Sequence, residues 1–407
     1  MAKTKRNLTE PSNRNAELTR LRNLKMAESS HRYVRGSTEQ FYQWLESSKA
    51  GVVPMGPPVW ICGDCHVGNL GPISNAQGRV EIQIRDLDHT VIGNPAHDLI
   101  RLALSLASAA RGSNLPGVTT FLIMESIMEG YELAFAPDFD AEADLETPPS
   151  IISALRASIN ASWKTLARDR IADETPKIPL GKKFWPLQKD ERNDINSASI
   201  SGEVHNLVTM LKSRPTEGEV KLLDAAYWVK GCSSLGKLRY AAVLSVTAKK
   251  KKHQSFCLVD FKEASDTMAP PAETTKMPKN NAERVIEGAR HLSPHLGKRM
   301  AKAVILGKPV FVRELTPQDL KLELDQLEAT EATKVSAYLA AVVGKAHSRQ
   351  MNPDQRRDWL ATLRKMRSAD LDAPAWLWRT VVDLLSMHEK AYLEHCRRYA
   401  LASVQDD

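Results

Sequence analysis

One segment of the chain, from about residue 225 to residue 262, predicts strands, whereas the sequence on either side of it predicts helices. Stretches 227–230, 238–247 and 256–262 are largely apolar, and short polar turns separate them. Strands joined by such short turns pair in the antiparallel sense. Helical patterns precede this segment, as in 98–110, and follow it, as in 335–347. We therefore expect an α/β chain of the α+β kind, with a small antiparallel-sheet lobe set into a larger, helix-rich lobe.

The length and charge limit the classes of protein to which this chain can belong. A chain of 407 residues is long enough for two or three domains, and we place their boundaries at 1–220, 221–317 and 318–407. The excess of 56 Lys+Arg over 49 Asp+Glu gives a net charge of +7. Because these basic residues form no periodic stripe, we expect no nucleic-acid partner.

Three features of the sequence predict a cytoplasmic protein with no membrane contact. No stretch reaches the roughly 18 apolar residues of a membrane span. The N-terminal segment 1–15 is charged and lacks the apolar core of a secretory signal. Five cysteines are too few and too scattered for a disulfide framework, which favours a reducing compartment.

Two polar loops, 63–71 and 85–89, each follow a predicted strand, which is apolar at 59–62 and alternates apolar and polar residues at 80–84. Together the loops supply Asp64, His66, Asn69, Asp86 and Asp88, and we expect them to converge on one cation with Asn69, Asp86 and Asp88 as its ligands. Carboxylate and amide oxygens are hard ligands that suit Mg²⁺. The same residue types are common in turns, but three carboxylates at the ends of buried strands repel one another unless a cation compensates them. The two loops therefore predict a magnesium site.

A glycine-rich turn lies between the first two predicted strands of the sheet. Residues 231–237 (GCSSLGK) nearly match the P-loop pattern, but Leu238 stands where the Mg²⁺-binding hydroxyl belongs. A P-loop also begins a helix, whereas this turn begins the strand at 238–247. The pattern instead predicts a flap whose backbone amides can lie over phosphates. The nucleotide contacts that we expect from it are Gly231, Ser233, Ser234 and Gly236.

The third strand of the same meander ends in Lys262, which we expect to point toward phosphates beneath the flap. A lysine in that place needs a carboxylate partner. Glu283 and Glu287 lie one helical turn apart on the next predicted helix, and either can face it. Flap, strand lysine and helix glutamate form, in chain order, the phosphate-holding half of a kinase site.

Two alternative functions use the first polar loop. Cys62 and Cys65 form a C-x-x-C pair, but the chain has no second pair for zinc, and glycines rather than a helix follow the pair. The Asp64-x-His66 pattern is also similar to that of binuclear metallophosphoesterases, although the later Gly-Asn-His signature of those enzymes is missing. We expect His347 to be a structural histidine and not a ligand.

The polar loops resemble the catalytic segment of aminoglycoside phosphotransferases and other kinase-like enzymes. The matching residues are 63–69 (GDCHVGN), 86–88 (DLD) and 93–99 (GNPAHDL). The resemblance implies that Asp64 is the catalytic base and that Asn69 and Asp86 bind Mg²⁺. It further implies that Asp98 is a structural residue that holds the catalytic loop.

Nearly the whole chain also resembles an uncharacterised bacterial family, the domain of unknown function DUF2252. Besides the two loops, the matching pieces are 33–36 (YVRG), 98–102 (DLIRL), 231–236 (GCSSLG), 261–264 (FKEA), 284–288 (RVIEG), 311–315 (FVREL) and 346–349 (AHSR). In ordinary kinases the flap and the strand lysine precede the catalytic loop, and here they follow it. If both halves form one site, the chain has a circularly permuted, two-lobed kinase-like fold, which packing permits.

Together these features predict a phosphotransferase that depends on ATP and Mg²⁺ and acts on an unspecified hydroxyl acceptor. Arg35 and Arg101 are accessory candidates for phosphate or carboxylate contacts, with a structural ion pair as the alternative for each, and His66 is a third accessory candidate. The rival hypotheses are a nucleotide-binding pseudokinase, an AMP transferase and a metal-dependent phosphoesterase. A plain interaction scaffold would leave the grouping of Asp64, Asn69 and Asp86 unexplained.

Overall fold

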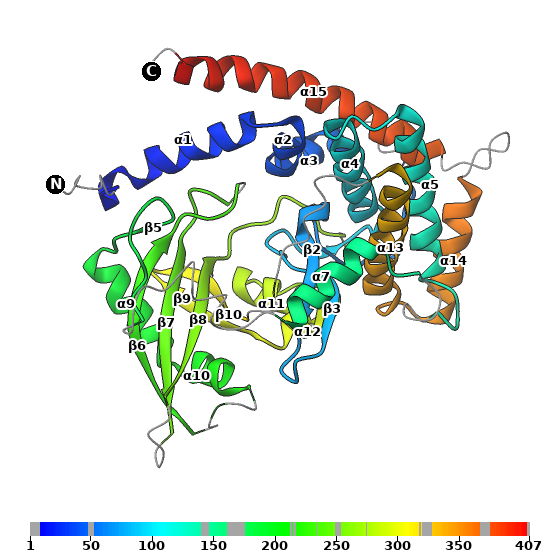
Figure 1. The fold of residues 1–407 in the computed structure, drawn as a ribbon. Helices are drawn as coiled ribbons and strands as arrows, with labels where there is room; N and C mark the ends of the chain where they lie inside the picture. The colour runs from blue at the N-terminus through cyan, green and yellow to red at the C-terminus, as the bar shows by residue number, and fades with distance from the viewer. Residues whose placement is uncertain are drawn as a thin grey trace.

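The residues that the structure describes form a six-stranded antiparallel sheet, two small sheets and a group of packed helices (Figure 1). The computed structural model describes residues 9–47, 53–139, 146–160, 176–211, 214, 217–232, 234–248, 254–273, 275–316, 319, 328–366 and 375–404. The strands are β1 (Val59–Ile61), β2 (Leu70–Ser74), β3 (Val80–Ile84), β4 (Val91–Gly93), β5 (Phe184–Trp185), β6 (Glu219–Trp228), β7 (Arg239–Thr247), β8 (Gln254–Glu263), β9 (Met300–Ile305) and β10 (Lys308–Leu315). This mixture confirms the predicted α+β class.

Helices precede, interrupt and follow the large sheet along the chain. The α-helices are α1 (Arg14–Ala27), α2 (Ser30–Gly36), α3 (Thr38–Glu46), α4 (Ala96–Gly112), α5 (Gly117–Leu133), α7 (Pro149–Ile159), α9 (Lys189–Ser199), α10 (Gly202–Thr209), α11 (Asn281–Leu292), α12 (Pro294–Gly297), α13 (Ala329–Ser348), α14 (Pro353–Lys365) and α15 (Ala375–Val404). Two short 3₁₀ helices, η1 (Pro11–Asn13) and η3 (Val67–Asn69), complete the described elements.

The large sheet contains the predicted meander and extends it on both sides. Its order is β5-β6-β7-β8-β10-β9, and every neighbouring pair is antiparallel. The three predicted strands are β6, β7 and β8, but β6 begins earlier than expected, at Glu219. The first half of β6 and most of β9 mix exposed and partly buried side chains with single buried ones, so neither segment has the continuous apolar run that predicts a strand.

The two faces of this sheet differ in chemistry because successive side chains on a strand point to opposite faces. One face, which includes Tyr240 and Phe261, packs in a buried cluster with residues of α9 and α10. On the other face Lys262 of β8 stands opposite Arg239 of β7, and Asp260 stands opposite Arg313 of β10. The second face therefore gathers four charged side chains at adjacent positions.

The two small sheets carry the predicted polar loops. β1 pairs with β4, and β2 pairs with β3, both in the antiparallel sense. The first loop leads from β1 to β2 and the second leads from β3 to β4, so each connects one small sheet to the other. The strand predicted at 80–84 is β3 and that at 59–62 is β1, whereas β2 begins inside the predicted polar loop. Because their ends are paired in this way, the two loops lie side by side.

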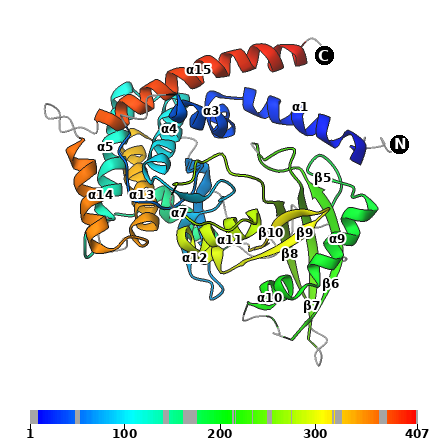
Figure 2. The ribbon, with the colours of Figure 1, turned by 180° about the vertical axis from the view of Figure 1, so that it is seen from behind.

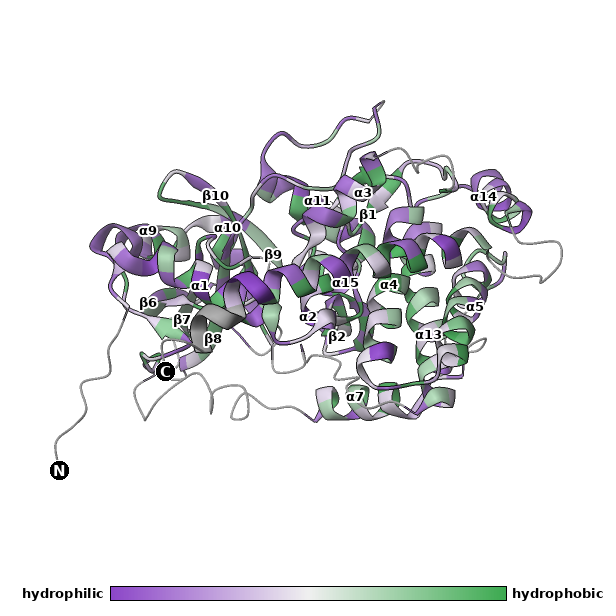
Figure 3. Cartoon of the chain, turned by 90° about the horizontal axis from the view of Figure 1, so that it is seen from above, coloured by the Kyte–Doolittle hydropathy of each residue, from purple (hydrophilic) through white to green (hydrophobic). Residues whose placement is uncertain are grey.

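Helices α5 and α13 approach each other closely because glycines lie where they cross. A Cβ on Gly130 of α5 would lie 2.0 Å from the carbonyl oxygen of Ala337 of α13, and a Cβ on Gly344 of α13 would lie 2.7 Å from the Cβ of Ala134. Both helices are coloured mainly green for hydrophobic residues in Figure 3, whereas α9 and α14 are mainly purple. This pair forms part of the main core, which also includes α4, α11 and α15.

Helices α1 and α15 run side by side along one edge of the molecule (Figure 2). They extend from the packed helices toward the large sheet (Figure 2). Tyr392 Oη of α15 donates to the carbonyl oxygen of Ala27, at 3.1 Å. At its other end α1 contacts the sheet region through Arg14, which lies 2.6 Å from Glu191 of α9, and through Leu18, which belongs to the core of the sheet. The buried clusters therefore contain residues from both sides of the predicted boundaries at 220 and 317. The division into domains stays a prediction.

None of the helices among the described residues has both the length and the apolar character needed to cross a membrane. All five cysteines are free. Three of them, Cys62, Cys65 and Cys257, are buried.

Three shielded histidines make the folding stability depend on pH. Burial lowers the pKa of His66 to about 3 and the pKa of His97 and of His388 to about 4. A histidine in an unfolded chain titrates near pH 6.5. Between about pH 6.5 and pH 4, the unfolded chain therefore binds more protons than the folded chain. The contribution of these residues is fully present above this window and is lost as the pH falls through it.

The wild type loses stability between pH 7 and pH 5, and we expect this loss to be about 2 kcal/mol smaller in His388→Leu. His388 is 1% exposed, so a neutral apolar side chain suits its surroundings. The measurement is the free energy of unfolding in urea at the two pH values. His291→Leu is the control, because the His291 side chain is 44% exposed. Equal pH dependence in His388→Leu and the wild type would contradict the prediction.

Candidate functional site

The first polar loop turns sharply at Gly63, directly after β1. Gly63 has a φ of +75°, and a Cβ there would lie 2.1 Å from the carbonyl oxygen of His89, so this position requires glycine. Tyr42 Oη donates to the Gly63 carbonyl oxygen at 2.6 Å. Farther along, the Val67 N–H donates to Ser105 Oγ at 2.9 Å. These bonds hold the loop at both ends.

Asp98, in the first turn of α4, holds the same loop through its carboxylate. The backbone N–H groups of Cys62 and Gly63 donate to it at 2.7 and 2.9 Å. Its Oδ2 also lies 3.2 Å from His347 Nε2, and His347 Nδ1 lies 2.9 Å from Tyr131 Oη. All three side chains are completely buried. Asp98 and His347 therefore make the contacts of structural residues behind the loop.

Asp64 is buried in an ion pair with Arg101 of α4. Arg101 Nε donates to Asp64 Oδ1 at 2.8 Å, and Arg101 Nη2 donates to the Val34 carbonyl oxygen at 2.7 Å. Arg101 is completely buried, so of its two predicted roles the structure shows the ion pair. Burial opposes the ionisation of Asp64, but Arg101 outweighs it and lowers the pKa of Asp64 below its usual value. His66 Nε2 lies 3.9 Å from Asp64 Oδ2, and its low pKa keeps His66 neutral.

The second polar loop is held by Arg284 of α11, which the motifs did not single out as a site residue. Arg284 donates to the carbonyl oxygens of Thr90 and, at 3.1 Å, of Asp88. The Arg85 N–H donates to the Asn69 carbonyl oxygen at 2.7 Å and so joins the second loop to the first. Arg284 is 3% exposed, and a buried arginine on an otherwise apolar helix face was the available signal.

Lys262 reaches the second loop and pairs with both of its aspartates. Lys262 Nζ lies 2.6 Å from Asp88 Oδ2, and 3.1 and 3.2 Å from the two carboxylate oxygens of Asp86. The Lys262 side chain is 2% exposed, whereas that of Asp86 is 41% exposed. Residues that are 176 positions apart in the sequence thus meet at one point.

The predicted pairing of Lys262 with a glutamate of α11 differs from what the structure shows. Glu283 pairs with Lys302, with 2.5 Å between the charged atoms, and Glu287 pairs with Arg290 at 3.0 Å. Both glutamates line a surface groove of about 430 Å³ beside β9. Each residue of a helix is rotated by about 100° from the next, so α11 presents Arg284, not Glu283, to the acidic loop. The loop itself supplies the carboxylates that Lys262 needs.

Arg239 and Arg313 bring two further positive charges to Asp86. Both pair with Asp260, Arg239 at 2.6 Å and Arg313 at 3.1 Å. Desolvation opposes the ionisation of the partly exposed Asp86, but Lys262, Arg313 and Arg239 together lower its pKa. Burial and the neighbouring charge of Asp86 raise the pKa of Asp88. No sequence motif points to this group, although strand alternation places Asp260 on the same face as Lys262.

The glycine-rich flap joins β6 to β7, as predicted, and its last residue, Lys237, contacts the segment that follows β8. Gly231 and Gly236 have φ values of +103° and +106°, which favour glycine. Lys237 Nζ bonds to Ser265 Oγ. Burial lowers the pKa of His89, and the charge of Lys237 acts on it in the same direction. The base of the flap therefore lies within electrostatic range of the loop that carries Asp86 and Asp88.

Helices α1 and α2 contact both the flap and the first loop. Lys25 Nζ of α1 donates to the Gly231 carbonyl oxygen at 3.1 Å. A Cβ on Gly231 would lie 2.2 Å from Ser234 Oγ, so Ser234 folds back over the flap. Arg35 of α2 packs against the first loop, where a Cβ on Gly68 would lie 2.4 Å from its Nη2. Ser233 lies outside the described residues.

The residues near Lys262 fit a divalent cation by the chemistry of their donor atoms. Asp88 Oδ1 is buried and has no hydrogen-bond partner, which is unfavourable for a carboxylate oxygen unless a ligand satisfies it. Asn69 Nδ2 donates to the Asp64 carbonyl oxygen at 3.0 Å, so Oδ1 is the Asn69 atom that can bind a cation. With Asp86 these residues offer the oxygen ligands that Mg²⁺ prefers.

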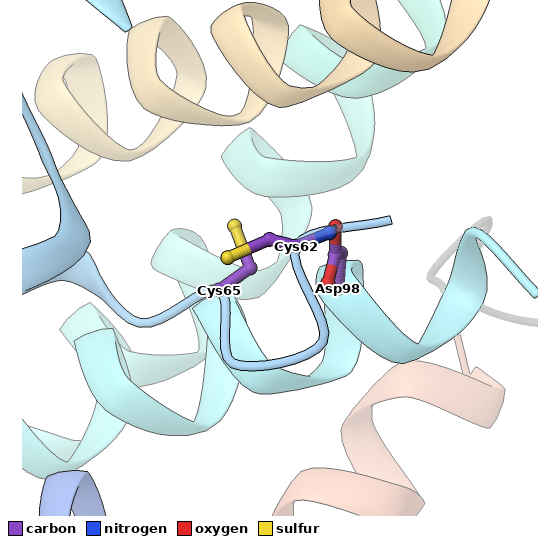
Figure 4. A group of neighbouring side chains, drawn as sticks. All are labelled: Cys62, Cys65 and Asp98. Atoms are coloured by element: carbon purple, nitrogen blue, oxygen red, sulfur yellow. Dashed lines mark hydrogen bonds between the residues drawn. The ribbon is translucent and has the colours of Figure 1, made fainter. Parts of the chain in front are cut away.

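A second group of possible metal ligands, Cys62, Cys65 and Asp98, fits a metal less well (Figure 4). Their ligand atoms lie within 4.8 Å of one another, and all three residues are buried. Both oxygens of Asp98 already accept backbone N–H groups. Burial raises the pKa of Cys62 well above its usual value, so it is a thiol and not the thiolate that binds metals. The pair also lies in a loop, not at the start of an α-helix as in a thioredoxin-type site.

A surface groove of about 750 Å³ lies elsewhere, between α10, α12 and the turn that joins β2 to β3. It is lined by residues that include Asn75, Asn206 and His295. Asp64, Asp86 and Lys262 do not line it. We place the candidate site at the two loops and not in this groove, because the loops gather the carboxylates, the lysine and an unsatisfied carboxylate oxygen.

Comparison with known proteins gives one match. A family model described as "Uncharacterized protein conserved in bacteria (DUF2252)" matches residues 14–398. No curated protein and no solved structure matched the chain. The matched region contains both polar loops, the flap and Lys262.

Proposed function

We propose that this chain, which belongs to the DUF2252 family, is a phosphotransferase that depends on ATP and Mg²⁺ and acts on a hydroxyl acceptor. The observation that carries the proposal is the meeting of Lys262 with Asp86 and Asp88 beside the loop of Asp64. A phosphate-gripping cation, oxygen ligands for a metal and a carboxylate near both are the groups that phosphoryl transfer requires.

Asp64 is the residue that we assign to the acceptor hydroxyl. Arg101 bonds to its Oδ1 and keeps it ionised. Its Oδ2, 3.9 Å from neutral His66, is then the oxygen that accepts the hydrogen bond of the hydroxyl and takes up its proton. Because this class of catalysis is mostly positioning, the burial that prevents Asp64 from moving favours this role.

Asp86, Asp88 and Asn69 are the residues that we assign to the metal, and Lys262 is assigned to the phosphates. Bound Mg²⁺ would neutralise the phosphates and the charge that develops during transfer. Lys262 is paired across the sheet with Arg239, the first residue of β7 after the flap, and in this proposal the backbone amides of the flap would cover the phosphates. Gly236 has no Cβ, and no atom of the described residues lies within 4 Å of the place that one would occupy, so a ligand can come close to the backbone of the turn there.

The fold that we propose for this activity is a kinase-like one in circularly permuted order, with two lobes. Its support is the order of the elements: β6, flap, β7, Lys262 on β8 and then α11 follow one another as in the phosphate-holding half of a kinase. The catalytic loops precede them in this chain. The nucleotide is the proposed partner, nucleic acid is not, and the five free cysteines support the cytoplasm as the compartment.

Stabilisation by ligands tests the binding half of this proposal. We expect ATP with Mg²⁺ to stabilise the wild type by about 2.7 kcal/mol at a hundredfold excess over Kd, and ATP without Mg²⁺ to have a smaller effect. Asp88→Asn removes the negative charge whose Oδ2 lies 2.6 Å from Lys262 Nζ, and it should abolish the difference between ATP with Mg²⁺ and ATP alone. Asp354→Asn is the control, since that carboxylate is 77% exposed on α14. Equal stabilisation of the wild type with and without Mg²⁺ would contradict the site.

Transfer of label tests the chemical half. ATP labelled at the α- or the γ-phosphate is incubated with the protein, Mg²⁺ and a mixture of hydroxyl compounds. The proposal requires transfer of the γ label. Transfer of the α label would show an AMP transferase, binding without any transfer would show a pseudokinase, and hydrolysis of an aryl phosphate in the absence of ATP would show a phosphoesterase.

A further inference from the structure

We infer that Lys262 is a tethered cation that occupies the divalent-metal position while no nucleotide is bound, so that metal and nucleotide bind strongly only together. The inference rests on the proposed function, because it takes Asp86 and Asp88 to be the metal ligands. It goes beyond that function by assigning to Lys262 a role in the nucleotide-free protein.

The contacts of the Lys262 ammonium group carry the first step. Both oxygens of Asp86 and one oxygen of Asp88 lie within 3.2 Å of Nζ. The remaining oxygen, Asp88 Oδ1, is the one without a hydrogen-bond partner. A cation that binds these two carboxylates must therefore displace Lys262 from three of the four oxygens.

The burial of Lys262 carries the second step. Its side chain is 2% exposed, and its neighbours across the sheet are Arg239 and Phe311. Nζ lies 5.8 Å from the centre of the Phe311 ring. A buried ammonium group that loses these carboxylates is left as an uncompensated charge. It leaves the carboxylates only if another anion is offered close by, and phosphates beneath the flap are such an anion.

The local charges carry the third step. The cations Lys262, Arg239 and Arg313 stand against the carboxylates of Asp86, Asp88 and Asp260, and their formal charges balance. A divalent cation alone would add two positive charges to this group, and phosphates alone would face two aspartates. Metal and phosphates together bring charges of opposite sign. Each therefore favours the binding of the other, and thermodynamic linkage makes the effect reciprocal.

Titration with Mn²⁺ alone, in the absence of nucleotide, tests the inference. Free Mn²⁺ is followed by electron paramagnetic resonance in the wild type and in Lys262→Met. We expect the variant to bind Mn²⁺ at least about tenfold more tightly, since the competing charge is gone and both carboxylates remain. Lys302→Met is the matched control, because Lys302 also pairs with a carboxylate, that of Glu283, but on the outer side of α11. Equal Mn²⁺ affinity in the wild type and Lys262→Met would overturn the inference.

The coupling between ligands is the second measurement. A non-hydrolysable ATP analogue should tighten Mn²⁺ binding to the wild type at least about tenfold and should have a smaller effect on Lys262→Met. Lys262→Arg keeps the charge and should behave as the wild type does. If Lys262→Met does not fold, Lys262→Gln provides the same comparison.

The failure of this inference can be told apart from the failure of the proposed function. If no Mn²⁺ binds to the wild type with the ATP analogue or to Lys262→Met, then Asp86 and Asp88 are not metal ligands and the proposed function fails with the inference. If Mn²⁺ binds to the wild type with the analogue, but wild type and variant bind Mn²⁺ alone equally, only the inference fails. The double variant Lys262→Met, Asp88→Asn should lose the gain in Mn²⁺ affinity that Lys262→Met shows. If it keeps that gain, the metal binds elsewhere.

Discussion

Replacing Asp64 with asparagine is expected to lower phosphoryl transfer by about 10²- to 10⁴-fold, while stabilisation by ATP with Mg²⁺ is retained. Asparagine keeps an oxygen that can accept the bond from Arg101 Nε, which is 2.8 Å long in the wild type, but it removes the carboxylate that would take up the proton of the acceptor. Asp64 makes no contact with Lys262 among the described ion pairs, so the metal and phosphate contacts should remain. The measurement is the rate of transfer from γ-labelled ATP.

A control is needed because Asp64 is also half of a buried ion pair. Removing one partner of such a pair commonly costs about 3–5 kcal/mol of stability. Glu314→Gln provides the comparison, since Glu314 is 3% exposed and lies 2.5 Å from Arg214 within the large sheet region. Both variants should unfold at lower urea concentration, and only Asp64→Asn should lose transfer. An Asp64→Asn protein that transfers phosphate at the wild-type rate would reduce Asp64 to a structural carboxylate.

Replacing Gly130 with alanine is expected to destabilise the protein by about 3 kcal/mol. The added Cβ would lie 2.0 Å from the carbonyl oxygen of Ala337. Because that oxygen belongs to the backbone of α13, the two helices would have to move apart. The same helix carries His347, which lies 3.2 Å from Asp98, so a shift of α13 would also disturb the support of the first loop. The free energy of unfolding in urea measures the effect.

Gly117→Ala is the matched control for this substitution. Gly117 begins the same helix, α5, and a Cβ there would meet no atom within 4 Å. Alanine also favours the helix over glycine, so no loss of stability is expected. If Gly130→Ala and Gly117→Ala unfold at the same urea concentration, the close approach of α5 to α13 does not limit the stability of the core.

The strands and polar loops could be predicted because their signals are local. The apolar runs of β7 and β8, with a polar turn between them, indicate antiparallel strands without any knowledge of the rest of the chain. The alternation of Val80, Ile82 and Ile84 likewise indicates β3. Two of the strands that escaped prediction, β5 and β9, lack such a run and become strands because a paired neighbour lies beside them. Pairing with a neighbour is a property of the tertiary structure.

The partner of Lys262 could not be predicted, because it depends on how a helix is rotated about its own axis. Glu283 and Arg284 are adjacent in the sequence, yet only Arg284 faces the second loop. The core residues of α11, such as Val285 and Ala289, set that rotation by packing against residues from distant segments. The same holds for Arg101, whose role follows from the place where α4 packs beneath the first loop.

The sequence by itself determined which chemical groups this protein has and on which kinds of element they lie: carboxylates in two loops after short strands, a glycine-rich turn between strands and a lysine at the end of a third. These properties follow from residue type and short-range periodicity. The tertiary structure alone decided which charges meet. It paired Lys262 with Asp86 and Asp88 and Asp64 with Arg101, because ion pairs between distant segments depend on the packing of the whole core and on which side chains that packing removes from water.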